Sequence, residues 1–201
     1  AHAIWLERYP SLYSSANNHR TAEGLGIFLI GALCPQLQSS ARWNRYGWNV
    51  VCEMLGQQVL ADGVGAEQSH SYTAAILEMF LLAWHAARHT GVSIPEFYLP
   101  RLEKAALCLR WFTDAGGRHP HIGDEDNARI IGGYVPGELY ISSMMNAVAS
   151  VSGDARLASP WHSYHLRQAL FGFAPCASVS PEGMKTFHEG GYTVGRHRIN
   201  H

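Results

Sequence analysis

The feature that most constrains the fold is a unit that recurs along the chain: a long amphipathic segment followed by a short connection rich in Gly, Pro or Asp. Within each segment the apolar residues return at intervals of three and four, which places them on one face of a helix. The segments predicted to be helical lie at about 17–33, 40–60, 67–89, 99–112, 140–151 and 161–173. Helices paired in antiparallel hairpins are typical of an α-solenoid or of a closed (α/α) toroid, and periodicity does not distinguish the two.

The composition favours one globular domain and excludes some partners. The 201 residues fall in the size range of a single domain, and 47% of them are hydrophobic, enough for a sizeable core. The net charge is −1 with no run of Lys or Arg, so we expect no nucleic-acid partner and no polybasic membrane segment. We also expect no membrane span, because no apolar stretch reaches about 18 residues. The four cysteines are far apart without a CxxC pair, and we interpret them as reduced thiols.

The sequence changes character near its C-terminus. Thr186-Phe187 and Tyr192-Thr193-Val194 are typical of short strands around a Gly190-Gly191 turn. The predicted organisation is therefore a helical domain over residues 1–180 and the start of a β domain over residues 181–201. The chain opens in sequence typical of a helix already under way and stops in strand-like sequence, so we expect the protein to continue at both ends.

Three polar motifs interrupt the apolar pattern at the starts of helices or loops. The first is Asn17-Asn18-His19 with Glu23 one turn beyond, the second is DGVGAEQSHSY at 62–72, and the third is HPHIGDEDNAR at 119–129. Two of these motifs also have a purely structural explanation. Asparagine favours helix caps, so an N-cap with a solvated neighbour accounts for the first motif. A tyrosine in the hydrophobic core accounts for Tyr72.

Taken in this order and spacing, the motifs resemble the (α/α)-toroid domain of the heparinase II/III-like polysaccharide lyases, a family that includes heparin, heparan sulfate and alginate lyases. The matching stretches are SSANNHRTAEGLGIF, EQS followed by Y, and IGDED, and the tail FHEGGYTVGRHR resembles the entry into the family's β-sandwich. By motif the resemblance runs from about Ser14 to Arg129. It implies a mainly α fold: an incomplete (α/α) toroid of antiparallel helical hairpins, ending in the first strands of a C-terminal β-sandwich.

The resemblance implies β-elimination at a uronic acid. In this reaction a base removes the C5 proton and the 4-O-glycosidic bond breaks, which leaves an unsaturated sugar. Because the C5 proton is only weakly acidic, the substrate carboxylate must be neutralised while negative charge develops on it. The family pattern assigns that neutralisation to Asn18, assistance or base catalysis to His19, and acid/base catalysis to Tyr72. The family also uses a histidine from the β-sandwich, which we expect to lie outside this chain.

Other polar residues of the three motifs are expected to contact substrate or to support the catalytic residues: Asn17, Glu23, Glu67, Gln68, Asp124 and Asp126. We place the two aspartates at the rim of the cleft. Two further interpretations of Asp124 and Asp126 stay open. They have the chemistry of the paired carboxylates of an inverting glycosidase, and together with His119 and His121 they have the chemistry of a metal site.

The resemblance implies no cofactor and no metal ligand in this chain, because a zinc or other divalent ion of the family belongs to the β region. We interpret the remaining histidine pairs, such as His85 and His89, as solvated helix faces. The expected partner is an acidic polysaccharide, and the expected location is periplasmic or secreted. The motifs do not distinguish heparan sulfate, alginate and bacterial exopolysaccharide as substrates. The alternatives are a toroid glycoside hydrolase and a non-catalytic carbohydrate-binding helical domain.

Overall fold

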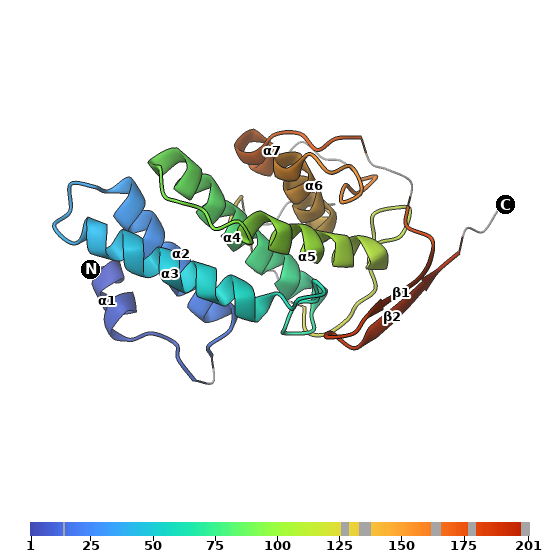
Figure 1. Cartoon of the computed structure of the whole chain (residues 1–201), viewed down its shortest axis with the longest axis horizontal. Coiled ribbons are helices and arrows are strands. Elements are labelled where there is room, and N and C mark those ends of the chain that lie inside the picture. The colour runs from blue at the N-terminus through green and yellow to red at the C-terminus, as the bar shows by residue number, and fades with distance from the viewer. Residues whose placement is uncertain (14, 126–128, 133–137, 162–165, 177–179, 198–201) are drawn as a thin grey trace.

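The computed structural model describes residues 1–13, 15–125, 129–132, 138–161, 166–176 and 180–197. Its elements follow one another as Figure 1 shows. In chain order they are α1 (His2–Arg8), α2 (Asn18–Leu33), α3 (Ser40–Gln58), α4 (His70–Thr90), α5 (Tyr98–Phe112), α6 (Tyr140–Ser152), α7 (Leu166–Phe171), β1 (Gly183–Phe187) and β2 (Tyr192–Arg196). The helical segments predicted from periodicity are thus present, followed by a strand pair at the C-terminal end.

Helices α2 and α3 form a tightly packed antiparallel hairpin. A Cβ atom added at Gly47 of α3 would lie 2.3 Å from the backbone nitrogen of Phe28 and 2.7 Å from the carbonyl oxygen of Gly24, both in α2. Any side chain at this position would therefore push the two backbones apart. Glycine has a conformational cost inside a helix, and here the close approach of the helices explains its presence.

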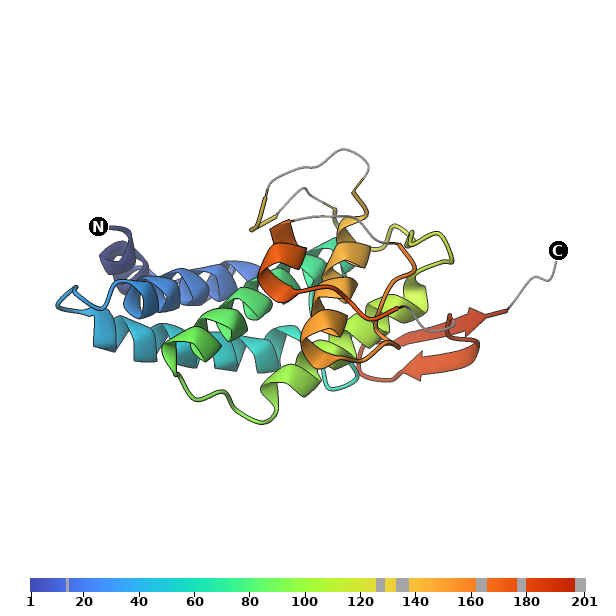
Figure 2. The ribbon, with the colours of Figure 1, turned by 90° about the horizontal axis from the view of Figure 1, so that it is seen from above.

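Helix α4 is the central helix of the molecule. It contacts α2, α3, α5 and α6, and Figure 2 shows it between the α2–α3 hairpin and α6. Most of its residues are buried, and they join one hydrophobic core with residues from the neighbouring helices. Because apolar area is removed from water on several sides, this burial is the main source of stability for α4.

A buried ion network ties the middle of α4 to α7. The carboxylate of Glu78 is fully buried, and its Oε1 accepts from Nε of Arg167 at 2.5 Å. The other oxygen accepts from the backbone N–H of Ile130 at 2.7 Å and from the hydroxyl of Tyr140 at 2.9 Å. Arg167 also pairs with Glu138 at 2.5 Å. Buried charges are tolerated when they are paired and hydrogen-bonded in this way.

The strands β1 and β2 form an antiparallel hairpin whose ends pair Gly183 with Arg196 and Phe187 with Tyr192. This confirms the predicted strand pair, and both strands are longer than the apolar pattern indicated. The turn of the hairpin docks on the connection between α3 and α4, where the carboxylate of Asp62 accepts from the backbone N–H groups of Glu189 at 2.7 Å and Gly190 at 2.9 Å.

Two predicted helix starts were wrong. The segment predicted from Glu67 begins only at His70, because Gln68 has a φ of 54° and Ser69 is the N-cap. Within the described residues the last helix begins at Leu166 rather than at Trp161. The backbone of Trp161 is instead held by side chains, since its N–H donates to Ser159 and its carbonyl accepts from Asn146.

The four cysteines, Cys34, Cys52, Cys108 and Cys176, are free thiols. Burial raises the pKa of Cys52 to about 11 and that of Cys108 to about 12. Both side chains are therefore protonated at neutral pH, when a thiol is a poor nucleophile. Among the described residues, no helix combines the length and the hydropathy that crossing a membrane requires.

Candidate active site

A polar pocket of about 190 Å³ lies where the N-terminal ends of α2 and α4 meet the loop that follows α5. Its lining residues come from three segments that are far apart in the sequence: Asn17, Asn18, His19, Glu67, Ser69, Tyr72 and Asp124. The fold therefore brings residues of all three polar motifs to one place.

The first wall of the pocket is the beginning of α2. Asn17 is the N-cap residue, and its side-chain oxygen accepts from the backbone N–H of His19 at 3.4 Å. The hydroxyl of Thr21 donates to the carbonyl oxygen of Asn17 at 3.3 Å, which reinforces the first turn. Asn17 thus satisfies the capping preference of asparagine. Asn18 is the first residue inside the helix and has a different partner.

Asn18 is held by the carboxylate of Glu67 through two contacts. One carboxylate oxygen accepts from the backbone N–H of Asn18 at 3.1 Å, and the other accepts from its side-chain Nδ2 at 2.9 Å. A carboxylate can only accept from these groups, so the contact fixes which way the amide is turned. An amide nitrogen carries two N–H donors. Glu67 uses one of them, and the second has no hydrogen-bond partner among the residues that the structure describes, so it can serve a ligand.

The second wall is the beginning of α4. Ser69 is the N-cap of this helix, and its hydroxyl oxygen accepts from the backbone N–H of Tyr72 at 3.2 Å. Its backbone carbonyl accepts from the hydroxyl of Thr73 at 2.6 Å. These contacts fix the first turn of α4, and with it the position of Tyr72, which is half-buried and lines the pocket.

The third wall is the IGDED loop. The carbonyl oxygen of Asp124 accepts from the hydroxyl of Ser69 at 2.6 Å and from that of Ser71 at 3.0 Å. Gly123 has a φ of 72°, and a Cβ atom there would lie 2.5 Å from the carbonyl oxygen of Gln68. A glycine is needed for both reasons, the backbone conformation and the close approach. The loop is therefore fastened to the start of α4.

Two predicted substrate-binding residues lie outside the pocket lining. The carboxylate of Glu23 accepts from the backbone N–H and the hydroxyl of Ser11 at 2.9 and 2.6 Å, and it pairs with Arg20 at 3.3 Å. It ties α2 to the segment that precedes it. Gln68 is exposed in the turn before α4. Asp126, the other predicted rim residue, falls outside the described residues, and contact of these three side chains with substrate stays a prediction.

Sequence reasoning missed Ser69, which lines the pocket and also holds both the first turn of α4 and the IGDED loop. A serine directly before an apolar helical run is a capping signal. This signal would have placed the start of α4 correctly. The contact between Ser69 and Asp124 had no signal in the sequence, because it joins residues 55 positions apart.

Two histidines lie beside this pocket. His70 is buried against Phe112, with ring centroids 4.5 Å apart, and its ring is 6.1 Å from that of His119. Burial, together with the nearby His119, lowers the pKa of His70 to about 4. The imidazole of His70 is therefore neutral at pH 7. Across the described residues, no cluster of three or more His, Cys, Asp or Glu side chains has the arrangement of a metal site.

Two helix ends give the pocket groups that can bind an anion, and the lining also contains the acidic residues Glu67 and Asp124. The N-terminal ends of two helices meet there, and each end has a partial positive charge from its unpaired N–H groups. No acidic residue lies within the first turn of either helix. Amide, imidazole and phenol groups lie beside them, and the carboxylate of Glu67 is occupied by two N–H groups of Asn18. This arrangement suits a carboxylate that must be bound and neutralised without a full positive charge.

The fold resembles that of solved lyase structures. A crystal structure titled heparinase III superposes with a TM-score of 0.66 over 92% of this chain and 27% of that chain, at 21% identity. The molecule is thus mainly helical, part of an (α/α) toroid, with strands at its C-terminal end. The predicted fold class is confirmed.

The amino-acid sequence assigns the family. Residues 1–129 match the model described as heparinase II/III N-terminus, and the chain therefore belongs to the heparinase II/III family. A protein named heparin-sulfate lyase from Pedobacter heparinus is 28% identical over 114 residues, which are 56% of this chain and 17% of that protein. A protein of the same name from Bacteroides thetaiotaomicron is 27% identical over 113 residues, which are 55% of this chain and 16% of that protein. The match thus spans about a sixth of each relative.

Proposed function

We propose that the protein containing this chain cleaves a uronic-acid-containing polysaccharide by β-elimination at the pocket between α2 and α4. The observation that carries this proposal is the convergence of Asn18, His19 and Tyr72 on one pocket, although Tyr72 is separated from the other two by most of α2 and all of α3. Membership of a lyase family supports the same reaction class.

The proposed reaction begins with the substrate carboxylate bound by the amide of Asn18. The contact between Asn18 and Glu67 turns the amide nitrogen toward a fixed position, and its second N–H donates to the carboxylate. Hydrogen bonds of this kind stabilise charge as it develops on the carboxylate in the transition state. His19, one residue further along the first turn of α2, assists at the same group or acts as the base.

Tyr72 completes the elimination. The base removes the proton from C5, the electron pair of the C–H bond forms the C4–C5 double bond, and the bond between C4 and the glycosidic oxygen breaks. The phenol of Tyr72 then donates its proton to that oxygen, so that the products are a new chain end and an unsaturated uronate. A positioned acid or base of this kind contributes roughly 10² to 10⁴-fold to a rate.

The substrate we propose is a heparan-sulfate-like polysaccharide, because two relatives carry the name heparin-sulfate lyase. Its uronate carboxylates match the pocket's two helix N-termini. Alginate and bacterial exopolysaccharides supply the same carboxylate chemistry and serve as the comparison substrates. A polysaccharide of this size does not cross a membrane unaided, so we propose a periplasmic or secreted location, which fractionation of the native host tests.

The substitution Tyr72→Phe in the full-length protein tests the proposal. Cleavage of heparan sulfate produces an unsaturated uronate that absorbs in the ultraviolet, and we expect the initial rate to fall by roughly 10² to 10⁴-fold. Tyr13→Phe is the matched control, because this tyrosine is 92% exposed and outside the pocket lining. An unchanged rate in Tyr72→Phe would falsify the assignment. New reducing ends without the ultraviolet product would favour a hydrolase instead.

A further inference from the structure

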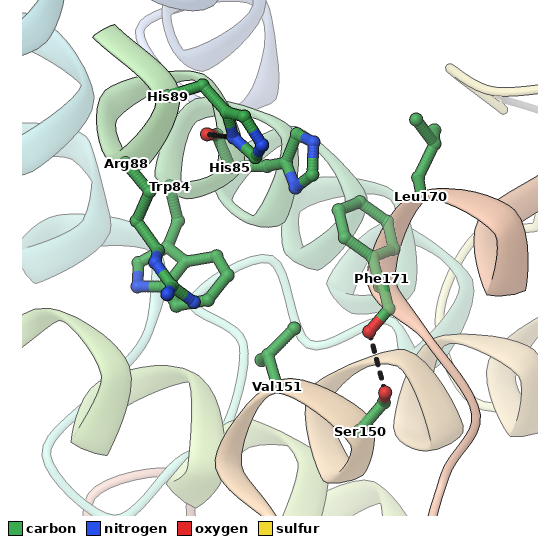
Figure 3. A pocket seen from close by; sticks show the side chains of 8 residues that line it. All are labelled: Trp84, His85, Arg88, His89, Ser150, Val151, Leu170 and Phe171. Atoms are coloured by element: carbon green, nitrogen blue, oxygen red, sulfur yellow. Dashed lines mark hydrogen bonds between the residues drawn. The ribbon is translucent and has the colours of Figure 1, made fainter. Parts of the chain in front are cut away.

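A second pocket lies at the opposite end of α4. It has a volume of about 370 Å³ and is formed by the last turns of α4 and α6 together with α7 (Figure 3). The residues that line it are Trp84, His85, Arg88, His89, Ser150, Val151, Leu170 and Phe171. With 21 residues and a rise of 1.5 Å per residue, α4 is roughly 30 Å long, and the two pockets lie at its opposite ends.

Two histidines stand side by side at this pocket. His85 and His89 are four residues apart in the sequence HAARH, so one turn of α4 brings them to the same face. Their ring centroids are 4.2 Å apart, and the rings are inclined by 36° (Figure 3). Two histidines at this spacing on a helix can ligate one metal ion, as in the HExxH zinc motif.

The ring of His89 is already oriented for ligation. Its Nδ1 lies 2.8 Å from the carbonyl oxygen of His85, drawn as a dashed line in Figure 3. A carbonyl oxygen only accepts, so Nδ1 carries the proton and Nε2 has the free lone pair of the neutral ring. A hydrogen bond from the second ring nitrogen to a carbonyl oxygen is the usual support of a metal-binding histidine.

The ring of His85 is held from the other side. It meets the ring of Phe171 edge-on at 5.8 Å, and the carbonyl oxygen of Phe171 accepts from the hydroxyl of Ser150 at 2.6 Å. These contacts fix the orientation of the His85 ring beside that of His89.

Arg88 has the only permanent charge among the eight lining residues, and its guanidinium stacks on Trp84 rather than on either imidazole. Its guanidinium lies over the ring of Trp84, 4.8 Å from the ring centroid. Figure 3 shows this stacked pair apart from the histidine rings. The cation–π contact keeps the positive charge on the aromatic surface.

We propose that His85 and His89 bind a divalent transition-metal ion, each through one ring nitrogen. Imidazole ligands suit Zn²⁺, Cu²⁺ and Ni²⁺ rather than Ca²⁺ or Mg²⁺, which prefer oxygen. Two protein ligands leave coordination positions for water or for an anionic oxygen ligand that enters the pocket. The site is independent of the lyase chemistry proposed above. It gives this histidine pair a function in place of the solvated helix face that we predicted from the sequence.

Titration of the purified, untagged protein with Zn²⁺ against a chromophoric chelator tests the site. We expect one Zn²⁺ per chain at this site, bound more weakly than at a site with three or four protein ligands. We expect His85→Gln and His89→Gln each to weaken its binding by more than tenfold, since even an outer-shell partner is worth roughly 10- to 100-fold. His89 is exposed, so His89→Gln should leave the thermal unfolding midpoint without metal unchanged. Zn²⁺ should raise that midpoint in the wild type and not in the variant.

The control is the double variant His2→Gln/His188→Gln, which removes two exposed histidines outside the pocket lining and should bind Zn²⁺ like the wild type. Addition of Co²⁺ to isotope-labelled protein locates the ion, because it should broaden the amide resonances of residues 85–89 first. The absence of a Zn²⁺ ion bound at this site, or undiminished binding in His89→Gln, overturns the proposal. So does broadening that begins around His119 and His121 instead.

Discussion

Helix α4 has a polar pocket at each end, and the two pockets are built differently. At its N-terminal end the lining comes from the start of α2, the start of α4 and the loop after α5. At its C-terminal end half of the lining residues belong to α4 itself, and His85 and His89 are one helical turn apart. The first pocket therefore depends on long-range contacts, whereas the key pair of the second is set by the geometry of one helix.

Because one pocket depends on long-range contacts and the other on a single helix, the two pockets should tolerate different perturbations. Asn18 is positioned by Glu67 from 49 residues away, and Asp124 by Ser69 from 55 residues away. Loosening the packing of the helices separates such partners. Histidines spaced i and i+4 remain neighbours for as long as the helix itself persists. We therefore expect the N-terminal pocket to fail first when the tertiary structure is weakened.

The largest effect should come from the middle of α4, between the two pockets. Glu78→Gln removes one partner of the buried pair with Arg167, and we expect the free energy of unfolding to fall by about 3 to 5 kcal/mol. Urea denaturation followed by circular dichroism measures the loss. The matched control is Glu53→Gln on the exposed face of α3, which should change stability by less than about 0.5 kcal/mol. Equal effects of the two substitutions would contradict the role of the network.

The N-terminal end should also be the more sensitive of the two to acid. The pKa of His70 is about 4 in the folded protein, against 6.5 in the unfolded chain, so between these pH values only the unfolded state takes up the proton. His70 therefore destabilises the fold as the pH falls from about 6.5 to 4, by on the order of 3 kcal/mol at the lower end. At pH 7 and above this contribution is absent.

The difference between wild type and His70→Gln isolates this effect from the titration of the carboxylates. Urea denaturation at a series of pH values gives both stability curves, and we expect the variant to lose less stability between pH 7 and pH 4. The control is His2→Gln, which replaces an exposed histidine of α1 and should leave the slope of the curve unchanged. Parallel curves for wild type and His70→Gln would show that His70 titrates normally.

The smallest of these effects should come from Glu67, which positions Asn18 rather than reacting. In Glu67→Gln one acceptor oxygen becomes an NH₂ group that faces the backbone or side-chain nitrogen of Asn18, so the amide of Asn18 loses its fixed orientation. We expect kcat for heparan sulfate to fall by roughly tenfold, about 1.4 kcal/mol, with a smaller change in KM.

A double-mutant cycle with Asn18→Ala separates positioning from general destabilisation. If Glu67 acts through Asn18, then Glu67→Gln should have almost no further effect on kcat once Asn18 is alanine. The thermal unfolding midpoints of the variants are measured alongside. Additive losses of activity in the double variant would mean that Glu67 acts by a route other than Asn18.

The helices were predictable because the apolar pattern that defines them is local. Periodicity alone placed α2 and α3 within about two residues at each end. It failed at Glu67 because Gln68 has a φ of 54° and Ser69 caps the helix, while the carboxylate of Glu67 is used by Asn18 in another helix. It failed at Trp161 because side chains of other residues hold that backbone. In both places a tertiary contact overrides the local preference.

The sequence by itself determined the helical segments, the family, the three polar motifs and the spacing of His85 and His89, since each of these is a property of order and period along the chain. Only the tertiary structure decided that six of the predicted site residues share one pocket while Glu23 and Gln68 lie outside its lining, and that Ser69 joins two of the walls. The physical reason is the distance along the sequence over which each interaction acts. Helical period acts over a few residues, whereas the pocket requires hydrogen bonds between groups about 50 residues apart, which form only when the core has packed.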